Sequence, residues 1–316
     1  MGIIDTISAG FGMVNRRFWF IAVPVLLDLL LWLGPKFSIS PWLTTVLEQY
    51  HQSLNRGGVE LPPEQLEGLR TQGSHLTEVL GNVNLLGMLA WQVPSIIGAD
   101  LSDVATLTGS ISLHTLESGP AIAALFLALA VLGLGATCLY LGPIAQFVRS
   151  STANPWRFLR RFGVNWGYLL SFFALIAFIL VVAVVPLLLV ATLAAALNSL
   201  LGGLFSGLLF AAALWGWIYL FFTVNAILVS EVNAITAIGH SIAIVKRNFW
   251  ASLRFIGLVL LIQWGLPVAW KLVLKHSMGV PVAIVGNAYV ETGLAAATMI
   301  FYRDRLAQWQ KANQPL

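Results

Sequence analysis

Charged side chains are scarce in this chain of 316 residues. Lys, Arg, Asp and Glu together make up 9% of it, whereas 58% of the residues are hydrophobic. A soluble globular domain normally carries about 25% charged residues, so these few charges cannot cover a water-exposed surface. Several apolar runs also reach the roughly 20 residues that a helix needs to cross a bilayer. The composition therefore excludes an ordinary soluble protein and predicts an all-α integral membrane protein.

Residues that carry chemistry are equally sparse. The single cysteine, Cys138, excludes a disulfide within the chain and a thiolate metal site. None of the five histidines pairs with another at the i, i+4 spacing of helical metal sites. Walker loops, G-x-S-x-G, H-E-x-x-H and the dinucleotide-binding glycine pattern do not occur in the sequence. We therefore expect no catalytic residues, no metal and no cofactor.

The net charge of +4 does not indicate a nucleic-acid partner. The basic residues fall at the ends of apolar runs, which is typical of membrane topology, and they do not gather into a nucleic-acid footprint. We expect membrane lipids as partners, other membrane protein subunits as a second kind of partner, and no nucleic acid.

Six apolar runs are long enough to cross the membrane. They comprise residues 17–34, 119–147, 166–197, 203–230, 250–274 and 280–302. The first could also be a cleaved signal peptide, but the Gly-Pro-Lys-Phe after Leu33 lacks the small-residue cleavage pattern, which favours a permanent anchor. The third and fourth runs are separated only by Asn198 and Gly202-Gly203, which suits a tight hairpin turn.

These runs divide the chain into three parts. Residues 1–35 form an interfacial helix and the first span, and residues 36–118 form an extracytoplasmic helical segment that caps the bundle. Residues 119–316 contain spans two to six with further interfacial helices and a short cytoplasmic tail. Within the second part, SPWLTTVLEQYHQSLN is typical of a helix with a serine before a first-turn proline. Residues 61–91 resemble one or two amphipathic helices.

The distribution of basic residues predicts the orientation. Twelve of the 17 Lys and Arg residues fall on the side of the membrane that holds the N-terminus, and five fall on the other side. The positive-inside rule therefore places both termini in the cytoplasm, as an even number of spans requires. We expect a multi-pass protein of the bacterial cytoplasmic membrane.

One short pattern recurs ahead of the apolar runs. Residues 14–19 (VNRRFW) match residues 245–250 (VKRNFW), and a looser copy, NPW at residues 154–156, precedes the third run. In each copy, a short amphipathic helix would lie in the cytoplasmic interface, with basic side chains at the lipid headgroups and a tryptophan where the chain enters the bilayer. The plan predicts three hairpins that repeat in parallel. The expected interface anchors are Arg16, Arg17, Trp19, Trp156, Arg160, Arg161, Lys246, Arg247 and Trp250.

The segment EVNAITAIGHSIAIVKRNFWASLRFIGLVLLI, residues 231–262, carries a resemblance. An acidic residue leaves one span, Ala-Ile and Ser241 follow, and Val-Lys-Arg-Asn-Phe-Trp leads into the next span. This segment resembles poorly characterised bacterial six-span membrane proteins, which are similar to the membrane domain attached to some glycerophosphodiester phosphodiesterases. The resemblance covers about a tenth of the chain and implies six spans with interfacial helices. It carries over no catalytic residue.

Polar residues inside the spans are the candidate site, because a charge in the bilayer is costly and often functional. Glu291 lies 12 residues before Arg303, about 18 Å inside the cytoplasmic boundary, and Asn287 lies one turn earlier on the same face. The candidate intramembrane polar site comprises Glu291, Asn287, Asp28, Gln263 and Asn225. Two interpretations stay open: a path for protons or cations, and hydrogen bonds that join helices.

Three functions follow from these patterns. The first is a non-catalytic membrane protein that organises lipid or partner membrane subunits, since interfacial helices are present and catalytic motifs are absent. The second is a small-solute or ion transporter or channel with a polar path near Glu291. The third, a lipid-modifying membrane enzyme, depends on the resemblance alone.

Overall fold

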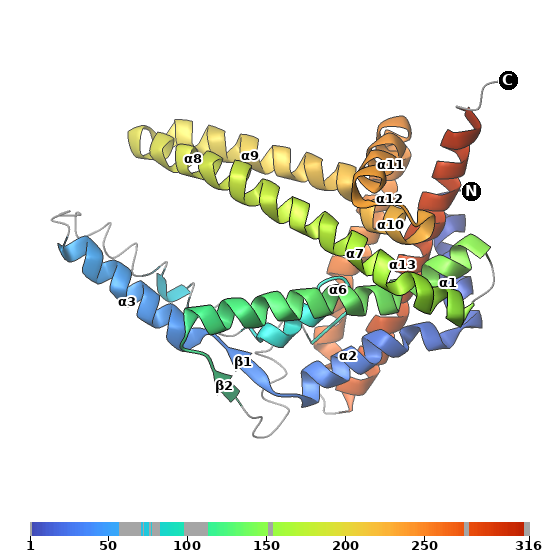
Figure 1. Cartoon of the computed structure of the whole chain (residues 1–316), viewed down its shortest axis with the longest axis horizontal. Coiled ribbons are helices and arrows are strands. Elements are labelled where there is room, and N and C mark those ends of the chain that lie inside the picture. The colour runs from blue at the N-terminus through green and yellow to red at the C-terminus, as the bar shows by residue number, and fades with distance from the viewer. Residues whose placement is uncertain are drawn as a thin grey trace. The chain divides into compact units, whose positions relative to one another are not determined.

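The computed structural model describes residues 2–56, 71, 73–75, 77, 83–97, 113–150, 154–274 and 278–312, and it is helical almost throughout (Figure 1). The sequence prediction of an all-α membrane protein is confirmed at this level. The helices are α1 (Ile3–Arg16), α2 (Ala22–Leu33), α3 (Ser40–Arg56), α6 (Gly119–Ser150), α7 (Pro155–Ile179), α8 (Val185–Leu197), α9 (Ser199–Leu220), α10 (Thr223–Ser230), α11 (Ala234–Arg247), α12 (Phe249–Val273) and α13 (Gly279–Ala312). Three shorter helical turns lie at Phe18–Ile21, Leu85–Ala90 and Leu180–Val184.

Among the described residues, five helical stretches are long and apolar enough to cross a membrane, which supports a multi-pass protein. They are Gly119–Ser150, Pro155–Ala195, Ser199–Ser230, Phe249–Val273 and Gly279–Lys311. The first of the six expected spans coincides with a shorter apolar helix, Phe18–Leu33. Six spans therefore stay a prediction.

The long stretch from α7 to α8 differs from the expected boundaries. Its helix begins at Pro155, because Asn154 caps it by accepting a hydrogen bond from the Arg157 N–H at 3.1 Å. A π-helical turn at Leu180–Val184 then joins α7 to α8. Pro186 follows it, and a proline has no N–H for the preceding turn, so the helix widens locally.

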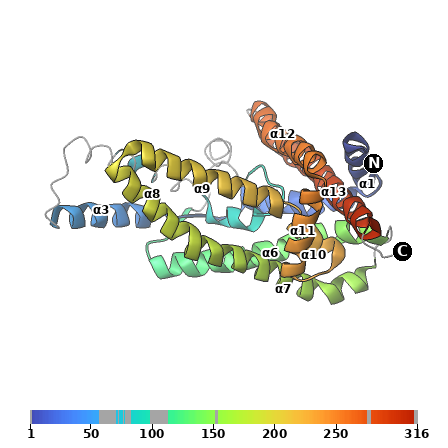
Figure 2. The ribbon, with the colours of Figure 1, turned by 90° about the horizontal axis from the view of Figure 1, so that it is seen from above.

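The α8 and α9 helices run side by side in opposite directions, as Figures 1 and 2 both show. Asn198 makes the turn between them, and its Oδ1 accepts from the Leu200 N–H at 2.8 Å. Gly202 permits the close approach, because a Cβ on it would collide with Ala195.

The described residues group into two compact units. The first unit comprises Met1–Phe20, Cys138–Gly265 and Val290–Leu316, and the second comprises Ile21–Thr137 and Leu266–Tyr289. A stack of three buried rings forms part of the first unit's core: the Phe301 ring lies 5.5 Å from that of Phe222 and 4.4 Å from that of Phe255. Burial of such large apolar rings is a main source of stability in any helical core.

In the second unit, a pair of short strands was not predicted. Strand β1 (Lys36–Ser38) pairs in parallel with β2 (Leu113–Thr115), with Phe37 opposite His114. Asn84 supports the pair, because its Oδ1 accepts from the Phe37 N–H at 3.0 Å and also from the Leu86 N–H at 3.2 Å. The helix predicted to begin at Ser40 is α3. Most of the amphipathic helices expected at residues 61–91 lies outside the described residues.

The helices α1 and α11 share one plan. Each has 14 residues, and each is followed within two residues by Phe-Trp. Their buried positions also correspond at a constant offset: Thr6, Gly10 and Val14 in α1 match Ala237, Ser241 and Val245 in α11. This agreement supports the internal repeat, which stays a prediction.

Candidate functional site

Two of the five predicted intramembrane polar residues meet in the first unit. Glu291 on α13 is buried, and Gln263 on α12 is half-buried. The Gln263 Nε2 donates a hydrogen bond to Glu291 Oε2 at 2.9 Å. A carboxyl group that accepts from a neighbouring helix can join two spans without any ligand.

A second polar contact lies one residue further along α13. The hydroxyl group of Tyr140 on α6 donates to Thr292 Oγ1 at 3.1 Å, and both side chains are buried. Sequence reasoning missed this pair, because a tyrosine and a threonine inside apolar helices give no charge signal. Two hydrogen-bonded pairs, Gln263–Glu291 and Tyr140–Thr292, thus join α12 and α6 to neighbouring positions on α13.

Two other predicted polar residues, Asn225 and Asn287, take no part in these two hydrogen-bonded pairs. Asn225 is buried on α10, and within the described residues no hydrogen bond links it to Glu291. Asn287 is buried one turn before Glu291 on α13, as the helical spacing predicts, and it belongs to the second unit.

Asp28 belongs to a different contact, inside the second unit. Its carboxyl group is fully buried and accepts hydrogen bonds from the Ser95 hydroxyl group, from the Ile96 N–H at 3.2 Å and from the Ile97 N–H at 3.4 Å. Asp28 therefore fixes residues 95–97 against α2.

The predicted interface anchors are mostly exposed. The indole rings of Trp19, Trp156 and Trp250 are more than half exposed, as membrane-interface residues are. Arg16, Arg160, Lys246 and Arg247 are exposed as well. Arg17 differs, because its guanidinium group lies 4.0 Å from the centre of the Phe147 ring, a cation–π contact.

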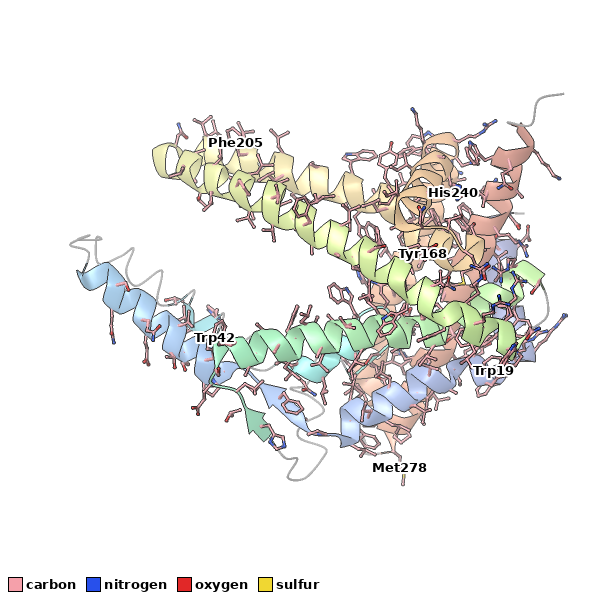
Figure 3. The ribbon with its side chains drawn as sticks, in the orientation of Figure 1. Trp19, Trp42, Tyr168, Phe205, His240 and Met278 are labelled. Atoms are coloured by element: carbon pink, nitrogen blue, oxygen red, sulfur yellow. The ribbon has the colours of Figure 1, made fainter. Side chains whose placement is uncertain are left out.

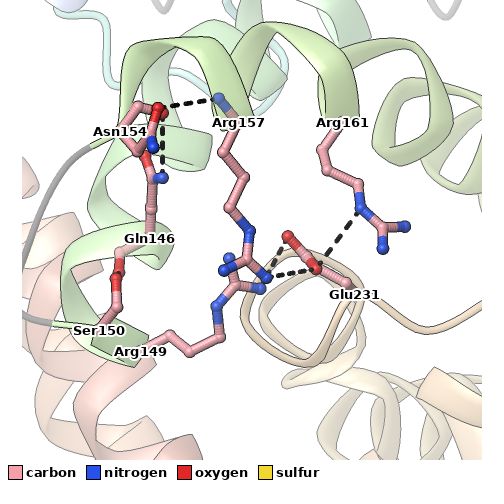
Figure 4. Close-up of polar contacts among 7 residues, drawn as sticks. All are labelled: Gln146, Arg149, Ser150, Asn154, Arg157, Arg161 and Glu231. Carbon is pink, nitrogen blue, oxygen red and sulfur yellow. Dashed lines mark hydrogen bonds and ion pairs between the residues drawn. The ribbon is translucent and has the colours of Figure 1, made fainter.

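Arginines from two helices converge on one glutamate in the first unit (Figure 4). Glu231 follows α10, and its side chain is 13% exposed. Its carboxylate oxygens lie 2.7 Å from Arg149 Nη1, 3.5 Å from Arg157 Nη2 and 3.8 Å from Arg161 Nε. We call these four residues the arginine–glutamate cluster.

Local structure positions the arginine–glutamate cluster. Glu231 has φ 53° and ψ 41°, the left-handed conformation that ends a helix, which is uncommon for a residue with a side chain. The end of α6 is joined to the start of α7 because Gln146 Nε2 donates to the Asn154 carbonyl oxygen at 3.1 Å. Sequence analysis predicted Arg161 as an interface anchor and did not bring it together with Arg149, Arg157 and Glu231. The sequence signal that could have indicated the cluster is one acidic residue, Glu231, on the membrane face that carries most of the basic residues.

A groove lies on the other side of α7. It has a volume of about 700 Å³ and is mostly apolar. Small residues at one-turn intervals on α7, Gly163, Gly167 and Ser171, line it together with Tyr168 and the start of α11. A Cβ on either glycine would meet nothing within 4 Å.

A short polar chain ends on α11. The Tyr302 hydroxyl group lies 2.7 Å from Ser230 Oγ and 3.3 Å from His240 Nδ1. Burial lowers the pKa of His240 below its ordinary value, which favours the neutral ring. His240 thus acts as a neutral hydrogen-bonding group between α11 and α13.

Most side chains on α8 and α9 stand away from the helix pair, Phe205 among them (Figure 3). In the most apolar part of the Pro155–Ala195 stretch, no residue is buried.

Within the described residues, no group of three or more His, Cys, Asp or Glu side chains could hold a metal ion. Comparison with protein-family models, curated protein sequences and solved structures finds no match to this chain.

Proposed function

We propose that the chain is a non-catalytic, six-span protein of the bacterial cytoplasmic membrane, with both termini in the cytoplasm, that organises lipid or partner membrane subunits. The observation that carries this proposal is the apolar stretch Pro155–Ala195. Its 41 residues would extend about 60 Å as a helix, roughly twice the hydrocarbon thickness of a bilayer. Its most apolar part is entirely unburied within the chain. Lipid or another protein must cover this surface.

The groove on α7 supports the same proposal. Membrane helices associate through small residues that let their backbones approach, and the chain itself leaves Gly163 and Gly167 open. The resemblance of residues 231–262 to the membrane domain of some phosphodiesterases fits a six-span plan with interfacial helices. It supplies no residue for an enzymatic reaction.

We expect wild-type protein purified in mild detergent to retain a stoichiometric membrane subunit or a defined set of lipids. Replacing both Gly163 and Gly167 with leucine should reduce this retention severalfold, because the new side chains fill the groove. The melting temperature should stay close to that of the wild type, since a Cβ at either position meets nothing within 4 Å and the rest of each leucine enters the open groove. Mass spectrometry of the purified complex measures what is retained.

The matched control replaces Gly203 and Gly207 with leucine. These glycines are equally open but lie on α9, away from the groove residues. Equal retention by the two double variants would reject the groove as the association surface. Purification of wild-type protein with neither a subunit nor a defined lipid would reject the organising function.

A transporter is the second candidate, because Glu291 and Gln263 form a polar pair inside two apolar helices. We expect Glu291→Gln to melt within a few degrees of the wild type, since the glutamine carbonyl group can still accept from Gln263 Nε2. Under the organising function, vesicles containing either protein should show the same background flux of protons and cations. A flux that the wild type supports and Glu291→Gln abolishes would establish transport instead.

A further inference from the structure

We propose that Arg149, Arg157 and Arg161 form a binding site for a phosphate ester, either the phosphate of an anionic lipid headgroup or that of a soluble phosphate compound. The proposal deepens the organising function and rests on it, because it gives that function a ligand class. It concerns only the first unit, to which all three arginines belong.

Charge balance is the first argument. Three guanidinium groups face the single carboxylate of Glu231, so the cluster keeps two uncompensated positive charges. A phosphate ester carries between one and two negative charges at neutral pH, which matches this excess.

Unused hydrogen-bond donors are the second argument. Only Arg149 lies within hydrogen-bond distance of Glu231, at 2.7 Å; the distances from Arg157 and Arg161, 3.5 Å and 3.8 Å, exceed the usual limit near 3.2 Å. The side chains of Arg157 and Arg161 are about half exposed, so an anion can reach them. Guanidinium groups bind phosphate oxygens through paired N–H groups, and a phosphate offers three acceptor oxygens.

Two buried polar atoms point to the same ligand. Arg149 Nε is buried without a hydrogen-bond partner, and so is the Oδ1 of Asn165, a residue that is only 7% exposed. Both residues line one narrow space with Arg157, Arg161 and Glu231. The space is about 10 Å³, room for one water-sized atom, so a single phosphate oxygen would fill it and accept from Arg149 Nε. The amide group of Asn165 could turn its NH₂ toward the same oxygen, while the rest of the phosphate would lie at the half-exposed guanidinium groups of Arg157 and Arg161. Five other buried side-chain atoms of the described residues also lack a partner, so the weight of these two comes from their position in one space with the three arginines.

Glu231 occupies the point on which the arginines converge. A phosphate that enters past the exposed guanidinium groups of Arg157 and Arg161 therefore competes with its carboxylate. The arginines lie at the end of α6 and in the first two turns of α7, next to apolar helices. Anionic headgroups are concentrated at such helix ends on the cytoplasmic side.

The test uses the full-length protein in nanodiscs and in detergent. Native mass spectrometry of protein mixed with equal amounts of phosphatidylglycerol, phosphatidic acid and phosphatidylcholine measures which lipids remain bound. Calorimetric titration with inorganic phosphate and glycerol 3-phosphate measures soluble ligands. The variants are Arg157→Gln with Arg161→Gln, Glu231→Gln, and Arg160→Gln as the matched control. Arg160 carries the same charge on the same helix but does not line the space.

We expect the wild type to prefer anionic lipids and the double variant to lose at least about tenfold in this preference, because it removes two guanidinium groups that would form charge-assisted hydrogen bonds to the phosphate. Arg160→Gln removes one exposed interface anchor outside the cluster, so it should lose less than about twofold in this preference. Glu231→Gln should bind more tightly, since it removes the competing carboxylate; this variant keeps the test valid if the double variant does not fold.

The outcomes separate cleanly. Retention of anionic lipid without binding of soluble phosphate identifies the headgroup as the source, and competition by glycerol 3-phosphate at similar affinity identifies a soluble ligand. Equal binding by the double variant and Arg160→Gln, or weaker binding by Glu231→Gln, would overturn the phosphate site. If a partner subunit still co-purifies in that case, the organising function stands and only the ligand assignment fails.

Discussion

Asp28→Ala should lower the free energy of unfolding by about 3 to 5 kcal/mol, because it removes the acceptor of three hydrogen bonds, two of them from buried backbone N–H groups. The three donors are the Ser95 hydroxyl group and the backbone N–H groups of Ile96 and Ile97. Asp28 and Ile97 are fully buried, so water cannot easily replace the lost acceptor. Unfolding in detergent, followed by tryptophan fluorescence, measures the loss.

Two further variants separate a structural role from an ion path. Ser95→Ala removes one donor together with its bond and should cost only about 1 kcal/mol. Asp28→Asn keeps one carbonyl oxygen and should fall between the two. If Asp28 lined a path for cations, Asp28→Asn would abolish a flux in vesicles while Asp28→Ala melted like the wild type; that pattern would contradict the structural role.

The apolar helices could be predicted from the sequence because membrane insertion depends on local composition. A run of about 20 apolar residues suffices for a span, whatever the rest of the chain does. The same locality explains why the helix beginning at Ser40 was predictable. The start of α7 at Pro155 was not predicted, since the expected apolar run begins only at residue 166, after the basic residues that follow Trp156. Their helix is in fact continuous with the apolar part.

Contacts between distant residues could not be predicted in this way. The strands β1 and β2 are three residues each, too short for an alternating pattern to emerge, and they pair across more than 70 residues of chain. The arginine–glutamate cluster likewise joins the end of α6, the start of α7 and the residue after α10. Composition indicates which side of the membrane these charges occupy, but only folding determines that three arginines face one glutamate.

Among the intramembrane polar residues, neighbours on one helix could be predicted from the sequence, whereas partners on different helices could not. Helical spacing correctly placed Asn287 one turn from Glu291 on α13. No rule of spacing within one helix could identify Gln263 on α12 as the donor to Glu291 Oε2, or Tyr140 on α6 as the donor to Thr292. Partners on different helices depend on packing, which a single sequence does not reveal.

Gly10→Ala should destabilise the first unit by about 1 to 3 kcal/mol, the usual cost of adding a methyl group to a filled site. A Cβ on Gly10 would lie 2.5 Å from the Gly293 carbonyl oxygen and 2.6 Å from the Ala297 backbone nitrogen. Both atoms belong to the backbone of α13, so no side-chain rotation can relieve the collision. The helix α1 would have to move away from α13, and the melting temperature in detergent should drop by several degrees.

Gly12→Ala is the matched control, because the same change two residues along α1 meets nothing within 4 Å. It should raise stability by up to about 1 kcal/mol, since alanine favours a helix more than glycine does. The two substitutions therefore have opposite signs although their chemistry is identical. In the Gly10→Ala background, Ala297→Gly should not restore stability, because the closest contacts are with backbone atoms. Restoration by Ala297→Gly would show that the side chain of Ala297, and not the backbone of α13, limits how closely α1 can approach.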